Sequence, residues 1–173
     1  MQTFYSLIAI ALVGLLALSL HRGTKGLQQR MIVNEVATQL SGVAVETLER
    51  IGQEPFDAKT DTTKVSKFPA VTDPSQLTNA ADFGGCFDFE LCEDIDDFDG
   101  LIIVRDYETL RFTVTIGVRY VLEDQPDIPS AGPTYAKEVS VSVANPRMWF
   151  FDPSNKLTVT MSRVFTYQKA TKA

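Results

Sequence analysis

An uncharged apolar run near the N-terminus constrains this 173-residue chain more than any other feature. Within residues 4–20, only Ser6, Gly14 and Ser19 interrupt the apolar side chains. As an α-helix the run would be roughly 26 Å long, at about 1.5 Å per residue, which is close to the roughly 30 Å of a bilayer core. The run therefore predicts a helix that is buried in an apolar environment outside its own domain.

A cleaved secretory signal is the first alternative explanation for this run, but its flanks differ from those of a signal. Such a signal begins with basic residues and ends at a small-residue cleavage site, whereas no Lys or Arg precedes Leu7 and the run is followed by His21 and Arg22. Basic residues on the C-terminal side alone would place that side in the cytoplasm. We therefore expect Met1 to be the first residue of a mature chain whose basic leader has been removed.

The next segment continues the helix. No proline occurs before Pro55, so residues 1–52 are predicted to form one long helix, in which Gly23 and Gly26 are the candidates for a loosened turn. Residues 1–26 would form the apolar segment and residues 27–53 an amphipathic helix with one buried face. The apolar residues that define this face are Ile32, Val36, Leu40, Val43, Leu48 and Ile51.

The C-terminal half has the alternation of β-strands, whereas residues 54–100 show no sustained period and are predicted to form an ordered loop region. Apolar and polar residues alternate through residues 110–122, 138–143 and 157–162, which predicts half-buried strands. Proline and glycine between these segments indicate hairpin-like connections. The predicted fold class is α+β: a long N-terminal helix, its apolar half projecting, packs on an antiparallel sheet formed within residues 101–173.

An apolar N-terminal helix, an amphipathic continuation and a C-terminal antiparallel sheet together resemble the type IV pilin and pseudopilin architecture. The Asp-Asp-Phe-Asp-Gly turn that ends at Gly100, followed by the later strands, is similar to the C-terminal halves of minor-pilin-like proteins. The chain departs from major pilins at Tyr5, where they carry a glutamate, and it lacks their proline near position 22.

The resemblance implies a structural subunit of an extracellular, type IV pilus-like filament at the cell surface. Its partners would be copies of itself, the inner membrane before assembly, a prepilin peptidase and the pilus assembly machinery, and its N-terminus would be methylated. Gly14 is the position where another helix can approach closely. The expected assembly core comprises Tyr5, Leu7, Ile8, Leu12, Gly14, Leu15, Leu16 and Leu18. The alternatives are a non-polymerising, pseudopilin-like single-pass component of a secretion or envelope complex, and a membrane-tethered binding module.

Two cysteines and an acidic turn are the other candidate sites. Cys86 and Cys92 are predicted to form a short-loop disulfide, with two independent buried thiols as the alternative. The aspartates of the turn could offer oxygen ligands to calcium, but Arg105 stands where an EF-hand loop has its last glutamate. A solvated acidic turn without a cofactor is therefore the favoured interpretation. The calcium candidates are Asp94, Asp96, Asp97 and Asp99.

The remaining features argue for interaction rather than catalysis. Trp149, Phe150 and Phe151 either fill the domain's own core or contact another subunit. A zinc site is not expected because His21 is the single histidine. The sequence has no nucleophile and base in a known catalytic order, so we expect no enzyme. The formal charge of −6 gives no basis for nucleic-acid binding.

Overall fold

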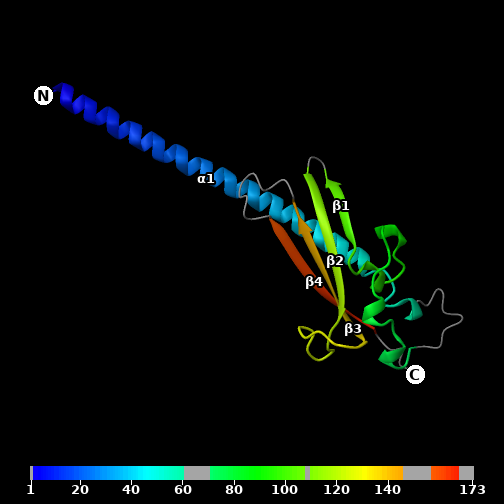
Figure 1. The fold of residues 1–173 in the computed structure, drawn as a ribbon. Helices are drawn as coiled ribbons and strands as arrows, with labels where there is room; N and C mark the ends of the chain where they lie inside the picture. Colours follow the sequence, from blue (N-terminus) through cyan, green and yellow to red (C-terminus); the bar gives the residue numbers. More distant parts are fainter. Residues whose placement is uncertain (1, 61–70, 108–109, 146–156, 168–173) are drawn as a thin grey trace. The chain divides into compact units, whose positions relative to one another are not determined.

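The computed structural model describes residues 2–60, 71–107, 110–145 and 157–167. In this part of the chain, one long helix, α1 (Gln2–Ile51), precedes five short 3₁₀ helices and a four-stranded sheet (Figure 1). The chain divides into two compact units, the first ending at Gln39 and the second beginning at Leu40. The predicted α+β class is confirmed.

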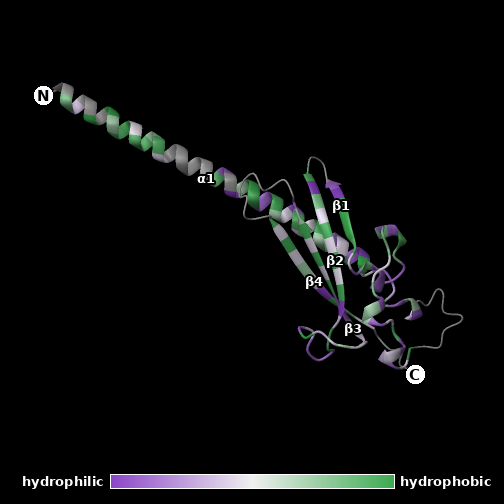
Figure 2. Cartoon of the chain, viewed as in Figure 1, coloured by the Kyte–Doolittle hydropathy of each residue, from purple (hydrophilic) through white to green (hydrophobic). Residues whose placement is uncertain are grey.

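Helix α1 follows from the composition of its sequence. It contains no proline, and its glycines occur only singly. Figure 2 shows hydrophobic residues along its N-terminal part and a mixture of hydrophobic and hydrophilic residues further on. The helix continues through Gly23 and Gly26, so the expected loosened turn is absent. Each glycine weakens a helix by only about 1 kcal/mol, and helical residues on both sides propagate the hydrogen bonding across them.

The sheet has the strand order β1-β2-β3-β4, and all neighbouring strands are antiparallel. Along β2, buried and accessible residues alternate as the sequence predicts. Valine pairs such as Val114 with Val143 lie opposite each other on the buried face, where branched side chains pack well. The strands are β1 (Ile102–Tyr107), β2 (Leu110–Tyr120), β3 (Ala136–Ala144) and β4 (Thr158–Thr166).

The C-terminal end of α1, which belongs to the second unit, packs on this sheet (Figure 1). Four residues of this end, spaced three or four apart, are almost inaccessible to solvent. Such spacing places side chains on one face of a helix. The four residues are Leu40, Ala44, Leu48 and Ile51.

In the described part of residues 54–100, short 3₁₀ turns shape the chain. Backbone hydrogen bonds tie the region together: the amide of Ile95 donates to the carbonyl of Pro55, and the amide of Gly100 donates to that of Ile116 in β2. The turns are η1 (Ala58–Thr60), η2 (Pro74–Gln76), η3 (Ala80–Asp82), η4 (Phe89–Leu91) and η5 (Asp96–Phe98).

Gly84 closes this loop region in a conformation that other residues rarely adopt. Its φ is +82°, and an added Cβ would lie 2.7 Å from the carbonyl oxygen of Asp99. We expect Gly84→Ala to lower the free energy of unfolding by about 2 kcal/mol, because a left-handed residue with a Cβ alone costs roughly 1–2 kcal/mol. Urea unfolding would measure this change. Gly132→Ala, whose Cβ meets no atom within 4 Å, is the matched control, and an equal effect at both positions would contradict the explanation.

Candidate functional site

The side chains of the first unit are unusual because most of those described are apolar and exposed. Of the expected assembly core, the described side chains other than Gly14 are between 42% and 67% exposed, and Leu7 lies outside the described side chains. A Cβ added at Gly14 would meet no atom within 4 Å. Exposed apolar surface of this extent marks a site of contact with another molecule. The exposed members are Tyr5, Ile8, Leu12, Leu15, Leu16 and Leu18.

The predicted membrane span is not confirmed. Among the residues that the structure describes, no helix combines the length and the apolar content that crossing a membrane requires.

Cys86 and Cys92 form the predicted disulfide, with their Cα atoms 5.4 Å apart. The bridge encloses η4, and the side chain of Asp88 caps this turn by accepting from the amide of Glu90. Within the same loop Phe87 is 93% exposed and Leu91 is 69% exposed. The bridge therefore holds two apolar side chains at the surface. The alternative of two independent thiols is wrong.

Removing the bridge should weaken the second unit. For a loop this short, the loss of chain entropy in the unfolded state corresponds to about 2 kcal/mol of stabilisation. We expect a reductant to lower the free energy of unfolding by that amount, as measured by urea titration. The double variant Cys86→Ala with Cys92→Ala is the control, because its stability should not respond to reductant. Labelling of free thiols in the native wild-type protein would contradict the assignment.

The four aspartates of the acidic turn do not converge on one point. A carboxylate oxygen of Asp97 accepts a hydrogen bond of 2.8 Å from the amide of Glu93, and one of Asp99 accepts 2.7 Å from the amide of Val118 in β2. These two carboxylates therefore hold the turn in place by accepting hydrogen bonds from backbone amides. Asp94 and Asp96 are buried and belong to a different cluster.

This buried charged cluster consists of Asp57, Asp94, Asp96 and Lys137. One carboxylate oxygen from each aspartate lies within 4.8 Å of the others. Lys137 on β3 is fully buried, and its Nζ donates to Asp96 Oδ1 and, at 2.6 Å, to the carbonyl oxygen of Phe56. The same Nζ lies 3.9 Å from Asp57 Oδ2. The ammonium of Lys137 thus occupies the position among the carboxylates that a bound cation would take.

Aromatic rings complete the surroundings of the cluster. Nζ of Lys137 lies over the rings of Phe56, Tyr120 and Phe83, at 4.2, 5.2 and 5.4 Å from their centroids. Such placement stabilises a cation once water is removed. Phe56 and Tyr120 are themselves buried.

The aspartates differ in how fully they are hydrogen bonded. Asp57 accepts from the amides of Lys59 and Thr78 at 2.9 and 2.7 Å. Asp94 accepts from Ala58 at 2.6 Å and from the two amides of its own turn. Oδ2 of Asp96 has no partner among the described residues. Asp96 is therefore the member with an oxygen available for further chemistry.

Burial shifts the ionisation of Asp94, Asp96 and Lys137 toward their neutral forms. Loss of solvation raises the pKa of Asp96 to about 7, although the nearby Lys137 opposes this rise. The pKa of Asp94 is also raised, by burial and by the charge of Asp97. Burial lowers the pKa of Lys137, against the opposing effect of Asp96. These directions follow from the cost of keeping a charge in a low-dielectric site.

Sequence reasoning missed Asp57 and Lys137 as site residues. A signal was present for Lys137, because it continues the alternation of Val139, Val141 and Val143 and so falls on the buried face of β3. A lysine at an inward position needs a partner. No comparable local signal marks Asp57, which lies in an irregular loop.

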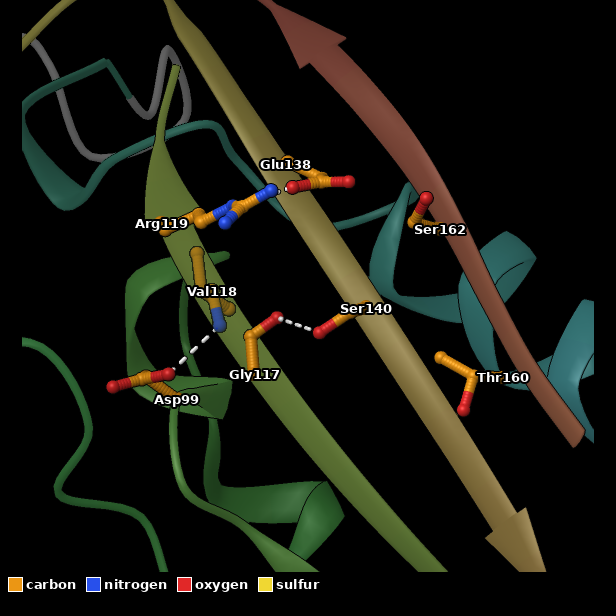
Figure 3. A pocket seen from close by; sticks show the side chains of 8 residues that line it. All are labelled: Asp99, Gly117, Val118, Arg119, Glu138, Ser140, Thr160 and Ser162. Atoms are coloured by element: carbon orange, nitrogen blue, oxygen red, sulfur yellow. Dashed lines mark hydrogen bonds and ion pairs between the residues drawn. The ribbon is translucent and has the colours of Figure 1, made fainter. Parts of the chain in front are cut away.

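A second polar site lies on the opposite, accessible face of the sheet, in a pocket of about 360 Å³. Figure 3 shows that several of its lining residues form hydrogen bonds or ion pairs with one another. Nε of Arg119 donates to Oε2 of Glu138 at 2.5 Å, and Oγ of Ser140 donates to the carbonyl of Gly117 at 3.3 Å. These two contacts link β2 to β3 on this face of the sheet.

The predicted contact cluster of Trp149, Phe150 and Phe151 lies outside the described residues. Comparison of the chain with protein-family models, with curated proteins and with solved structures finds no match. The function of this chain is therefore inferred from the geometry of its described residues and from the sequence resemblance.

Proposed function

We propose that this chain is the structural subunit of an extracellular, type IV pilus-like filament, in which the apolar N-terminal helices of neighbouring copies bundle together. The observation that carries the proposal is the exposure of the apolar side chains of α1 between Tyr5 and Leu18. Burying one such side chain contributes roughly 1.5–3 kcal/mol, so a bundle of many copies would be strongly stabilised.

The second unit supports the proposal in two ways. Its disulfide is of a kind that forms and persists in oxidising surroundings outside the cytoplasm. Its helix on an antiparallel sheet agrees with the architecture that the resemblance implies. Copies of the same chain are the proposed partners, assembled by the machinery of such filaments. The location of the subunit before assembly stays a prediction from its sequence.

Electron microscopy of material sheared from producing cells tests this proposal. We expect filaments that bind antibodies raised against the second unit. A chain found only in the membrane fraction, without filaments, would favour the alternative of a non-polymerising component of a secretion or envelope complex. Filaments that carry no antibody would exclude this chain as the subunit.

A further inference from the structure

The contact between Lys137 and Asp96 brings an amine and a carboxyl group together away from water. Lys137 comes from β3 and Asp96 from η5, 41 residues apart in sequence. Their side chains are 0% and 4% exposed. Nζ donates to Oδ1, while Oδ2 has no partner among the described residues.

We propose that Lys137 and Asp96 are a covalent modification site, at which Nζ of the lysine and Cγ of the aspartate join in an intramolecular amide bond. The reaction is a condensation that releases one water molecule. It is independent of the proposed filament function.

The electrostatics of the cluster favour the two reactive forms. An amine attacks only when it is unprotonated, and a carboxyl group loses hydroxide more readily from its acid form. Burial lowers the pKa of Lys137 and raises that of Asp96. Transfer of a proton from the ammonium to the carboxylate produces a neutral amine beside a carboxylic acid, and both shifts make this transfer less costly than it would be in water.

Proximity provides most of the remaining rate enhancement. A hydrogen-bonded amine and carboxyl group approach the roughly 3–3.5 Å separation of a reactive pair, for which effective concentrations reach about 10⁵–10⁸ M. Asp94 holds the electrophile in place, because its carboxylate accepts from the amides of Asp96 and Asp97. The side chains of Lys137 and Asp96 are 0% and 4% exposed, and this burial limits the water that would oppose condensation.

Asp57 is placed to transfer the proton that the reaction must move. Its Oδ2 lies 3.9 Å from Nζ and is oriented by the amide of Thr78. Such distances commonly shorten when the reaction begins. Asp57 accepts the proton from the attacking nitrogen and returns it to the departing hydroxyl. One N–C bond forms, one C–O bond breaks, water leaves, and Asp57 ends in its starting form, so no oxidant or reductant is required.

The product would tie the acidic turn permanently to the sheet. A cross-link over 41 residues restricts the unfolded chain as a disulfide does, but it cannot be reduced. A subunit with this bond would resist unfolding under load.

Mass spectrometry of the full chain, denatured and reduced, tests the bond directly. We expect a mass lower than that of the sequence by one water, and a proteolytic digest with a branched peptide joining the segments of Asp96 and Lys137. A mass equal to that of the sequence would overturn the proposal. A water lost elsewhere, with these two segments in separate linear peptides, would also overturn it.

Variants identify the reacting groups. Lys137→Arg removes the nucleophile and should retain the full mass of its sequence. Asp96→Asn should lose ammonia in place of water and so reach the same final mass as the wild-type product. Lys59→Arg, at an exposed lysine that donates to the carbonyl of Gln76, is the matched control and should still lose one water. Loss of water from Lys137→Arg or from Asp96→Asn would place the reaction at other residues and overturn the proposal.

Asp57→Asn tests the proton transfer separately. It preserves the size of the side chain but cannot accept the proton, so we expect the amide to form at least tenfold more slowly, in line with the usual contribution of general acid–base catalysis of about 10²–10⁴. Intact mass at intervals after synthesis measures the rate. Cross-linking at the wild-type rate would remove Asp57 from the mechanism.

Discussion

Replacing Gly14 with leucine should abolish filament assembly while leaving the second unit folded. In the single chain a Cβ at this position meets no atom within 4 Å, so the substitution disturbs nothing within the subunit. In a bundle, however, a residue without a side chain allows a neighbouring helix to approach closely. Tyr5 stands where the major pilins that this sequence resembles carry a glutamate, so in the proposed filament packing rather than an ion pair must set the alignment of the helices.

The measurement is the number of filaments seen by negative-stain electron microscopy, alongside the circular dichroism of the purified variant. Val13→Leu is the matched control, because Val13 is a neighbouring exposed position that already carries a side chain. We expect this control to assemble normally. Filaments of normal number and symmetry from Gly14→Leu would show that Gly14 is not at a contact between copies.

Replacing Lys137 with methionine should destabilise the second unit by about 3–5 kcal/mol, because removing one partner of a buried ion pair leaves the other charge uncompensated. The substitution keeps most of the side-chain volume, so packing changes little. Three buried carboxyl groups, those of Asp57, Asp94 and Asp96, would then remain without their cation. Urea unfolding would measure the loss. If the proposed amide is present, Lys137 carries no charge, and loss of the cross-link then replaces loss of the ion pair as the cause of the destabilisation.

Two further variants separate charge from packing. Lys59→Met changes an exposed lysine, and surface substitutions usually remain within about 0.5 kcal/mol. Adding Asp96→Asn to Lys137→Met removes one uncompensated charge, so the double variant should be at least as stable as Lys137→Met alone. If the double variant is instead less stable by the full effect of a second buried substitution, the two residues are not coupled.

Much of the fold could be predicted because its signals are local. The continuous helix to Ile51 follows from the absence of proline, and β2 follows from strict alternation, which the burial of its residues confirms. The edge strand β1 was less evident, because Ile102 and Val104 are exposed and neighbour other apolar residues. Alternation is informative only where one face is buried.

The candidate sites also differ in how far local sequence signals could predict them. The disulfide was predictable from an even cysteine count in a segment expected to lie outside the cytoplasm, whereas the surroundings of the acidic turn were not predicted. A solvated turn was the favoured interpretation of its four aspartates, but Asp94 and Asp96 are buried, and Asp97 and Asp99 accept hydrogen bonds from backbone amides. The backbone amide that each carboxylate contacts depends on how the loop folds. Sequence periodicity does not predict the conformation of such an irregular loop.

The sequence by itself determined the long helix, its exposed apolar residues and the strands β2, β3 and β4, since each depends on neighbours a few positions away. Only the tertiary structure decided that Lys137 meets Asp96 across 41 residues and the carbonyl of Phe56 across 81. The inward position of Lys137 shows that it needs a partner, but many acidic residues could have served. The choice was made when the irregular chain around Asp57 and η5 closed over the end of the sheet, where burying a lysine is tolerable only with carboxylates beside it.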